Sequence, residues 1–452
     1  MRVLFANAAA KFREVENRYR PLWPGYLAAY AQRELGSRDF QFRFATKDFR
    51  SELESYRPHL VGLSSVTQNF KMAEEFAGIA KERQIPVLVG GSHITALPES
   101  LTEEMDVACL GEGESTFVDL LKVFSAKGNL PPEDLSHVQG IAYRNDGTIT
   151  TTTPRPMFDT LDRIPHPDRK LIGYGKRSYV FTARGCPHAC IFCQNSRFWK
   201  GVRYASPEYV IEEIRELVNN GVRTIRIADD DFLADRGRAH RIVDLVVANG
   251  YNRRIKFSCW CRSNNVTREN VEALKAMNVV AVVLGLESAS PKILRYLKGS
   301  TVSVDDNARA VDLLKDAGIQ TSGDFVLGAP HETEEDMQET YDFIRKSRLD
   351  FVTINFLCPL PGTPLWNIAI RKGLVSKEMD WNQLSIKFNG DPGAAIILSK
   401  AMSYEKLKRI NRKFKILGAW KAAKALPRSP WLKELPAVGY RRLLEMLCSC
   451  WG

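Results

Sequence analysis

The chain has 452 residues, 44% of them hydrophobic and 26% charged, with a net charge of +11, and this length leads us to expect two or three domains. No stretch approaches the roughly 18 to 20 uninterrupted apolar residues of a membrane-spanning helix, and no basic segment typical of a signal peptide precedes the first apolar run. From these two observations we expect a cytoplasmic protein. The cations are not gathered into one stripe with interleaved aromatic residues, so we expect no nucleic-acid partner.

From the N-terminus to residue 130, short apolar runs alternate with amphipathic segments. We predict helices at 26–35 and 71–83, and strands at 3–7, 41–46, 60–66, 86–92 and 106–113. Continuous apolar strands separated by helices are typical of a doubly wound, Rossmann-like parallel sheet. Ligands bind beyond the carboxyl ends of such strands. Three polar segments are expected there, at residues 64–69, 90–93 and 111–114.

Residues 131–172 are rich in proline and turn-forming residues, and we interpret them as a linker with a small hairpin around residues 140–153. A second α/β series makes up residues 173–390. Its predicted helices lie at 207–221, 236–248, 270–278, 306–318 and 334–347, and its strands at 178–185, 224–231, 256–262, 279–288, 321–330 and 351–363. Six strands cannot close the usual eight-stranded barrel, so we expect a partial (β/α)6 barrel.

Residues 391–452 are predicted to form a small, mostly helical, basic region with several Trp and Leu residues. Such a region either makes peripheral contact with an anionic membrane surface or forms a solvated helical cap. Cys448 and Cys450 lie at its end. We interpret them as part of a frayed terminus, with extra metal ligands or a redox pair as the alternatives.

Three of the nine cysteines lie within eight residues, as Cys186, Cys190 and Cys193, directly after the first strand of the second series. In a cytosolic chain such a cluster indicates metal rather than disulfides. Three thiolates on one loop can bind three irons of a four-iron four-sulfur cluster and leave the fourth iron open to a small ligand. A zinc site would want a fourth protein ligand, and His188 lies too close in sequence to complete it easily. Three unrelated core cysteines are the other alternative, and Phe192 offers an apolar cover for a cluster.

At these residues the chain resembles the radical S-adenosylmethionine (SAM) superfamily, whose loop is C-x3-C-x-aromatic-C after the first strand of a six-stranded partial barrel. The segment 203–208 is similar to cobalamin-associated members, and the resemblance covers residues 1 to about 400. It implies that the open iron binds SAM. An electron from the cluster then cleaves SAM into methionine and a 5′-deoxyadenosyl radical. A flavodoxin- or ferredoxin-type protein is the expected electron donor.

The resemblance also implies SAM contacts, at Phe192, Asp229, Asp230, Asp231, Arg262, Glu287, Ser288 and Gly328. The three aspartates are expected at the methionine amine, with a helix N-cap cluster as the alternative. The arginine is expected at the methionine carboxylate, or is a surface arginine. The glutamate matches the ribose-contacting position, and the serine follows it in the same segment. The glycine lies on the strand expected beside the adenine, or is an ordinary turn residue.

The N-terminal domain resembles the cobalamin-binding domain that precedes the barrel in one branch of this superfamily. The implied cobalamin contacts are Ser64, Ser65, Thr67, Gln68, Asn69, Gly90, Gly91, Ser92, His93, Gly111, Glu112 and Gly113. The D-x-H-x-x-G string that holds cobalt in older cobalamin enzymes does not occur, so residues 67–69 are expected under the corrin. The histidine is a candidate cobalt ligand, although a loop histidine after a strand is more often a hydrogen-bonding residue. A domain of this fold that binds no cobalamin is the alternative.

The first functional hypothesis is a cobalamin-dependent radical SAM methyltransferase that acts on an unactivated carbon of a small-molecule, lipid or natural-product substrate. The second is a cyclase, oxidase or rearrangement enzyme of the same architecture. The third is a non-catalytic iron–sulfur protein or RNA-binding module. Methylthiotransferases of RNA carry three cysteines in their N-terminal domain, whereas residues 1–130 here contain only Cys109, which argues against them.

Three further cysteines belong to the barrel. Cys259 and Cys261 alternate along a predicted strand, so we expect their side chains on opposite faces, with one of them toward the barrel interior. Cys358, near the last strand, is another pocket candidate. Core packing is the favoured interpretation of all three.

Overall fold

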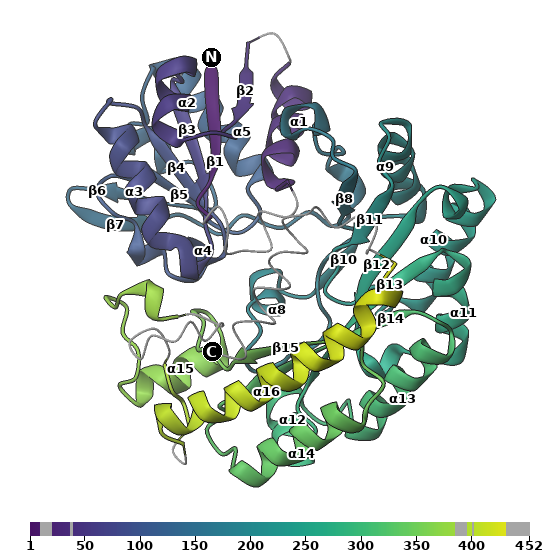
Figure 1. Ribbon diagram of the computed structural model, residues 1–452. Coiled ribbons are helices and arrows are strands. Elements are labelled where there is room, and N and C mark those ends of the chain that lie inside the picture. The colour runs from purple at the N-terminus through teal and green to yellow at the C-terminus, as the bar shows by residue number, and fades with distance from the viewer. Residues whose placement is uncertain (10–19, 37–38, 385–395, 400–401, 431–452) are drawn as a thin grey trace.

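The computed structural model describes residues 1–9, 20–36, 39–384, 396–399 and 402–430. Two units of strands and helices lie side by side in it (Figure 1). Among the helices in these ranges, none combines the length and the apolar character that a membrane crossing requires. Cys448 and Cys450 lie outside the described ranges.

The first sheet has seven strands in the order β2-β1-β3-β4-β5-β6-β7, and its first five pair in parallel. This arrangement confirms the predicted doubly wound sheet. The strands are β1 (Arg2–Asn7), β2 (Gln41–Phe44), β3 (Leu60–Ser64), β4 (Val87–Gly90), β5 (Val107–Cys109), β6 (Ile141–Asn145) and β7 (Thr148–Thr151). The helices are α1 (Trp23–Leu35), α2 (Phe49–Tyr56), α3 (Phe70–Lys81), α4 (Ser92–Ala96), α5 (Glu114–Lys127), α6 (Pro132–Leu135) and α7 (Arg169–Ile172).

An antiparallel hairpin extends this sheet at the β5 edge. β6 pairs with β5 through Cys109 and Ile141, and β7 pairs with β6. The turn between them places Asp146 and Gly147 at positive φ, as tight hairpin turns require. The sheet therefore runs past residue 130 into the segment predicted as a linker.

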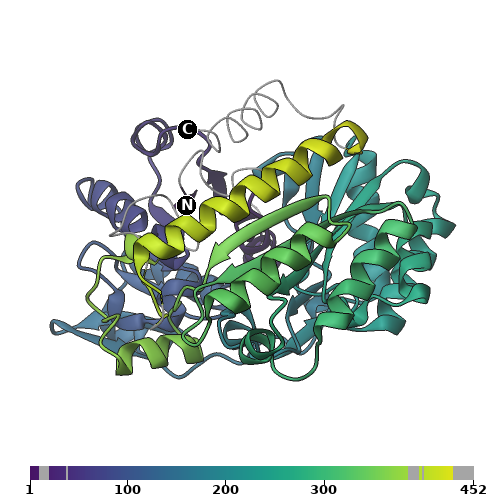
Figure 2. The same cartoon turned by 60° about the horizontal axis from the view of Figure 1, so that its bottom comes forward.

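The second sheet has six parallel strands in the order β15-β14-β13-β12-β11-β8, as predicted for a partial barrel. The strands are β8 (Arg177–Val180), β11 (Thr224–Ile227), β12 (Lys256–Cys261), β13 (Val279–Glu287), β14 (Gln320–Leu327) and β15 (Phe351–Phe356). The helices of this unit are α9 (Pro207–Asn219), α10 (Arg236–Ala248), α11 (Arg268–Ala276), α12 (Pro291–Lys298), α13 (Val304–Asp316), α14 (Glu334–Lys346), α15 (Pro364–Arg371) and α16 (Tyr404–Ala425). α16 runs along the outside of the sheet beside β15 (Figure 2).

The segment predicted as one strand at 178–185 is divided in two. β8 ends at Val180, and a short strand β9 (Ala183–Gly185) pairs in the opposite direction with β10 (Val202–Tyr204). The break occurs because Asp229, after β11, accepts hydrogen bonds from the backbone N–H groups of Thr182 and Ala183. The chain turns there and leads into the cysteine loop and α8 (Asn195–Phe198).

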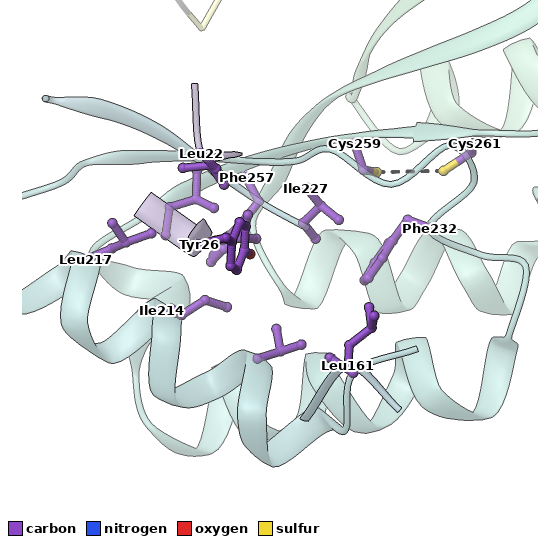
Figure 3. Close-up of a cluster of buried hydrophobic side chains, with 14 of the residues drawn as sticks. Leu22, Tyr26, Leu161, Ile214, Leu217, Ile227, Phe232, Phe257, Cys259 and Cys261 are labelled. Atoms are coloured by element: carbon purple, nitrogen blue, oxygen red, sulfur yellow. Dashed lines mark hydrogen bonds between the residues drawn. The ribbon is translucent and has the colours of Figure 1, made fainter. Parts of the chain in front are cut away.

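The prediction that Cys259 and Cys261 point to opposite faces is wrong. Residues two apart on a strand share a face, and the two sulfurs lie 3.7 Å apart. Figure 3 shows them on the side of β12 that packs with Phe232 and Phe257 in the core beneath the helices. Both thiols are buried and belong to this core, away from the barrel interior.

Candidate active site

A cavity of about 380 Å³ lies between the two sheets, beyond the carboxyl ends of strands from both. The first domain lines it with apolar side chains such as Phe5, Leu63 and Val89, and with Ser64, Gly90 and Gly91. The barrel lines it with Ala183, Gly185, Asn195, Phe198, Trp199 and Asp230. A smaller cavity of about 270 Å³ shares Gly111, Glu112 and Phe198 with it. Residues of both domains therefore border each of the two cavities.

The cysteine loop joins β9 to α8. Gly185 before it and Asn195 after it line the main cavity, whereas the three cysteines are not among the lining residues of either cavity. Cys186, Cys190 and Cys193 are free thiols of intermediate exposure. Burial raises the pKa of Cys186 to about 12 and that of Cys193 to about 11. Both thiols stay protonated at neutral pH, and a metal must displace their protons to bind.

The residues around the loop fit an iron–sulfur cluster with an attached ligand. Among the described residues, no three His, Cys, Asp or Glu side chains converge as a single metal ion requires. A four-iron cluster does not require its cysteines to converge on one point, because each cysteine ligates a different iron. Nη1 of the buried Arg262 lies 3.6 Å from Cys190 Sγ, and its Nε is buried without a hydrogen-bond partner in the described part of the chain. An unmatched guanidinium N–H beside the loop suits a carboxylate-bearing ligand.

The three consecutive aspartates have different environments. The carboxylate of Asp229 holds the chain at Thr182, as described above; burial raises its pKa to about 6, although Arg238 and its hydrogen bonds lower it. Asp231 accepts from the Arg262 backbone N–H (3.2 Å) and lies 3.3 Å from His188 of the cysteine loop. Asp230 lines the cavity. The first and third aspartates thus position the backbone, whereas the second lines the cavity and accepts a hydrogen bond from Asn195 Nδ2 at 2.6 Å.

Glu287 ends β13 in an unusual backbone conformation, with φ of 60° at a non-glycine residue. Such strain is typical of functional sites. Its carboxylate lies 3.7 Å from Lys298 Nζ and against Gly285, where an added Cβ would meet it at 2.6 Å. Burial raises the pKa of Glu287, and Lys298 lowers it. Lys298 and the close approach to Gly285 thus hold the carboxylate in place, and its contact with a ribose stays a prediction.

Two of the predicted SAM-binding residues make hydrogen bonds within the protein. The Ser288 hydroxyl lies 3.1 Å from the hydroxyl of Thr340 on α14 and accepts from the backbone N–H of Ser290. The Gly328 N–H donates to buried Glu332 at 2.6 Å. Phe192 packs against the second hydrophobic core from the cysteine loop. Which of the predicted side chains touch SAM stays a prediction.

The predicted cobalamin contacts fall into two groups. Those that line the main cavity are Ser64, Gly90, Gly91, Gly111, Glu112 and Gly113, whereas Ser92 lines the smaller one. Gly91 has φ of 110°, and an added Cβ would lie 2.2 Å from the Ser65 carbonyl oxygen, so only glycine fits there. Ser65, Thr67, Gln68 and Asn69 do not line either cavity.

His93 is turned away from the cavity and is fully buried. Its Nδ1 lies 3.2 Å from the Thr67 hydroxyl, and its ring packs against Phe70 and Trp381. These contacts agree with the hydrogen-bonding role favoured from the sequence. Burial lowers the pKa of His93 to about 3.

A His93→Gln variant is expected to lose less stability than the unmodified protein when the pH falls from 7 to 5. Because the folded-state pKa lies far below the ordinary value of 6.5, the unfolded chain binds a proton in this range that the folded chain does not bind. Stability therefore falls as the pH drops below 6.5, by up to about 1.4 kcal/mol per pH unit. Urea denaturation at both pH values measures this, and equal losses in the two proteins would contradict the neutral buried histidine.

An ion-pair network joins the two domains at the cavity wall, and the sequence alone does not predict its pairing. Arg184, two residues before Cys186, donates to Glu112 (2.8 Å) and Glu114 (2.6 Å) of the first domain. Arg203 on β10 donates to the same Glu112 at 2.7 Å. Glu112, predicted to contact cobalamin, is thus engaged by two arginines. No local signal indicates this pairing, because Arg184 and Glu112 lie 72 positions apart.

Comparison with known proteins agrees with this geometry. Family models match the radical SAM superfamily over residues 180–344 and a B12 binding domain over residues 11–121. An uncharacterized methyltransferase of Pyrococcus horikoshii is 31% identical over 384 residues, which cover 80% of this chain and 81% of that protein. The anaerobic magnesium-protoporphyrin IX monomethyl ester cyclase of Rubrivivax gelatinosus is 30% identical, over 81% of this chain and 69% of its own.

Solved structures show the same fold. The radical S-adenosylmethionine methyltransferase TsrM from Kitasatospora setae superposes with a TM-score of 0.70 at 18% identity, over 83% of this chain and 77% of its own. The cobalamin-dependent S-adenosylmethionine radical enzyme OxsB superposes with a TM-score of 0.67 at 18% identity, over 96% of this chain and 69% of its own. The order of a doubly wound domain followed by a partial barrel is therefore shared with them.

Proposed function

Because this chain belongs to the cobalamin-binding branch of the radical SAM superfamily, we propose that it is a methyltransferase acting on an unactivated carbon of a small-molecule, lipid or natural-product substrate. The observation that carries this proposal is the shared cavity. Ser64, Gly90 and Gly91 of the first domain and Asp230 beside the cysteine loop line the same space. A radical formed at the loop and a methyl carrier held by the first domain would both reach one substrate carbon there.

When bound, the cluster supplies the electron that cleaves SAM, and cobalamin supplies a carrier for the methyl group. The chain's own residues hold and orient these groups. Cys186, Cys190 and Cys193 would hold three irons. Arg262 is placed to pair with a carboxylate next to Cys190, and Asp230 with an ammonium group. These assignments rest on the positions of the side chains and on the resemblance.

The backbone of the first domain supports close approach of a flat ligand. Gly90 and Gly91 present no side chain to the cavity, and Gly91 tolerates none. The apolar floor formed by Phe5, Leu63 and Val89 excludes water from the space. Exclusion of water protects a reactive intermediate from side reactions.

The concave face of the second sheet favours a substrate with a polar end. Arg226 lies over the Trp260 ring, 4.1 Å from its centroid. Burial raises the pKa of Asp324, and Thr353 and Arg226 lower it. These side chains alternate with residues that pack under the helices, so they line the barrel interior. A polar group of the substrate could bind there to Arg226 or to Asp324.

A cyclase or other radical SAM reaction of the same architecture is the second candidate. The magnesium-protoporphyrin cyclase of Rubrivivax gelatinosus supports it at 30% identity, and the methyltransferase of Pyrococcus horikoshii supports the first candidate equally well. For either reaction we propose a flavodoxin- or ferredoxin-type electron donor and a location in the cytoplasm.

Product analysis after anaerobic reconstitution tests the proposal. The protein is loaded with iron, sulfide and hydroxocobalamin and then reduced in the presence of SAM. We expect S-adenosylhomocysteine together with 5′-deoxyadenosine, because methyl transfer and radical formation each consume SAM. 5′-Deoxyadenosine alone would favour the second candidate. Formation of neither product would overturn the assignment as a radical SAM enzyme.

A further inference from the structure

A second large cavity lies at the opposite ends of the barrel strands. It measures about 750 Å³ and lies beside the first residues of β13 and β14, next to the C-terminal part of α16. Its lining is strongly basic and contains a single carboxylate, that of Asp350. The cationic lining residues are Lys275, Lys315, Arg345, Arg348, Lys421, Lys424 and Arg428. The active-site cavity, by contrast, lies beyond the carboxyl ends of the strands.

Among the residues that the structure describes, Lys275, Lys421, Lys424 and Arg428 have no ion pair with a carboxylate. Arg345 and Arg348 pair with Asp342 and Asp316, which lie outside the cavity lining. Asp350 is occupied by Lys315, at 2.7 and 2.6 Å. Lys421 is only 5% exposed, and its Nζ donates to the Ser347 carbonyl oxygen at 2.7 Å. Burial lowers the pKa of Lys421 to about 8, with Lys424 adding to the effect and Asp350 opposing it. A buried ammonium group without an anionic partner is unfavourable, and a bound anion would offset that cost.

α16 presents a solvent-facing stripe beside this cavity. Positions spaced three or four residues apart lie on one face of a helix, and here they are all exposed: Arg409, Arg412, Lys413, Ile416, Trp420, Ala423 and Lys424. Ile416 is 43% exposed and Trp420 is 48% exposed. The opposite side of the helix, with Leu407, Phe414 and Leu417, is buried in the core. The helix itself runs along the surface of the molecule in Figure 2.

We propose that the exposed stripe of α16 and the adjoining basic cavity form a docking surface for an anionic lipid bilayer. Ile416 and Trp420 enter the interface between headgroups and acyl chains, where tryptophan is favoured. The surrounding Lys and Arg side chains attract the anionic leaflet, and the cavity accepts a lipid phosphate. The apolar centre of the stripe favours a bilayer over nucleic acid, because an exposed isoleucine gains nothing from a phosphate backbone.

This docking face does not depend on the chemistry at the active site. The cavity beside α16 and the cavity between the domains share no lining residue. Variants on α16 therefore leave the lining of the active-site cavity unchanged.

Co-sedimentation of the reconstituted full-length protein with vesicles tests the docking face. We expect binding to an equal mixture of phosphatidylcholine and phosphatidylglycerol, and much weaker binding to phosphatidylcholine alone. A Lys424→Glu/Arg428→Glu variant should lower the affinity at least about tenfold, since each cation contributes near an anionic surface. An Ile416→Ser/Trp420→Ser variant should lower it as well, with the cluster absorbance unchanged in both.

Matched control variants and soluble competitors distinguish bilayer docking from the binding of a free phosphate or of RNA. Val247→Ser, at an apolar residue 42% exposed on α10, and Lys122→Glu on α5 should leave vesicle binding unchanged. Binding of soluble glycerol phosphate by a protein that binds neutral and anionic vesicles equally weakly would show a site for a free phosphate ligand and overturn the proposal. Equal binding by the α16 variants, no binding to anionic vesicles, or tighter binding to duplex RNA than to vesicles would also overturn it.

Discussion

Replacing Cys190 with alanine is expected to abolish the brown iron–sulfur absorbance and the cleavage of SAM, while cobalamin binding is retained. The cluster depends on three ligands from one loop, and the loss of one leaves an iron without its thiolate. The proposed cobalamin contacts all belong to the first domain, and six of them line the shared cavity. Absorbance, iron content and 5′-deoxyadenosine formation after anaerobic reconstitution measure the effect, and gel filtration measures retained cobalamin.

A Cys358→Ala variant is the matched control. Cys358 is a free, buried cysteine of the second hydrophobic core and lies outside the cysteine loop. We expect it to keep the cluster and to lose no more stability than a typical core truncation, about 1 to 3 kcal/mol. A Cys190→Ala protein that keeps its iron absorbance would refute the assignment of the loop.

Replacing Arg184 with methionine is expected to destabilise the protein by about 3 to 5 kcal/mol, because it removes one partner of a buried ion-pair network. The Arg184 side chain is 11% exposed, and the side chains of Glu112 and Glu114 are 4% and 5% exposed. Glu112 keeps Arg203, whereas Arg184 is the ion-pair partner that the structure shows for Glu114. Urea denaturation measures the loss, and faster proteolysis within residues 131–172 should accompany it.

Two further variants separate the effect of the lost ion pairs from the effect of replacing an arginine side chain by methionine. Arg163→Met removes an exposed ion pair, because the side chains of Arg163 and Asp159 are 64% and 73% exposed. This variant should lower the free energy of unfolding by less than about 1 kcal/mol. Adding Glu114→Gln to Arg184→Met should restore part of the lost stability, because no unpaired carboxylate then stays buried at that position. Equal stability of the Arg184 and Arg163 variants would contradict a structural role for the network.

Several elements were predictable because their signals are local. The helix Arg236–Ala248 was predicted with these limits, and it begins after Asp235, whose carboxylate caps the backbone N–H of Arg238. The alternation of apolar strands and helices indicated both parallel sheets. The spacing of Cys186, Cys190 and Cys193 indicated a cluster, since three ligands on one loop need no knowledge of the rest of the fold.

The sequence by itself therefore determined the order of the elements, the cysteine loop and the set of polar residues beyond the strands. Only the tertiary structure decided which of these residues face the cavity: Asp230 does, while His93 turns toward Trp381. It also decided that Glu112 pairs with Arg184 and Arg203. The physical reason is the distance along the chain over which each signal acts. Helix and strand periodicity depend on residues a few positions apart, whereas the partner of a buried charge depends on how segments far apart in the chain pack together.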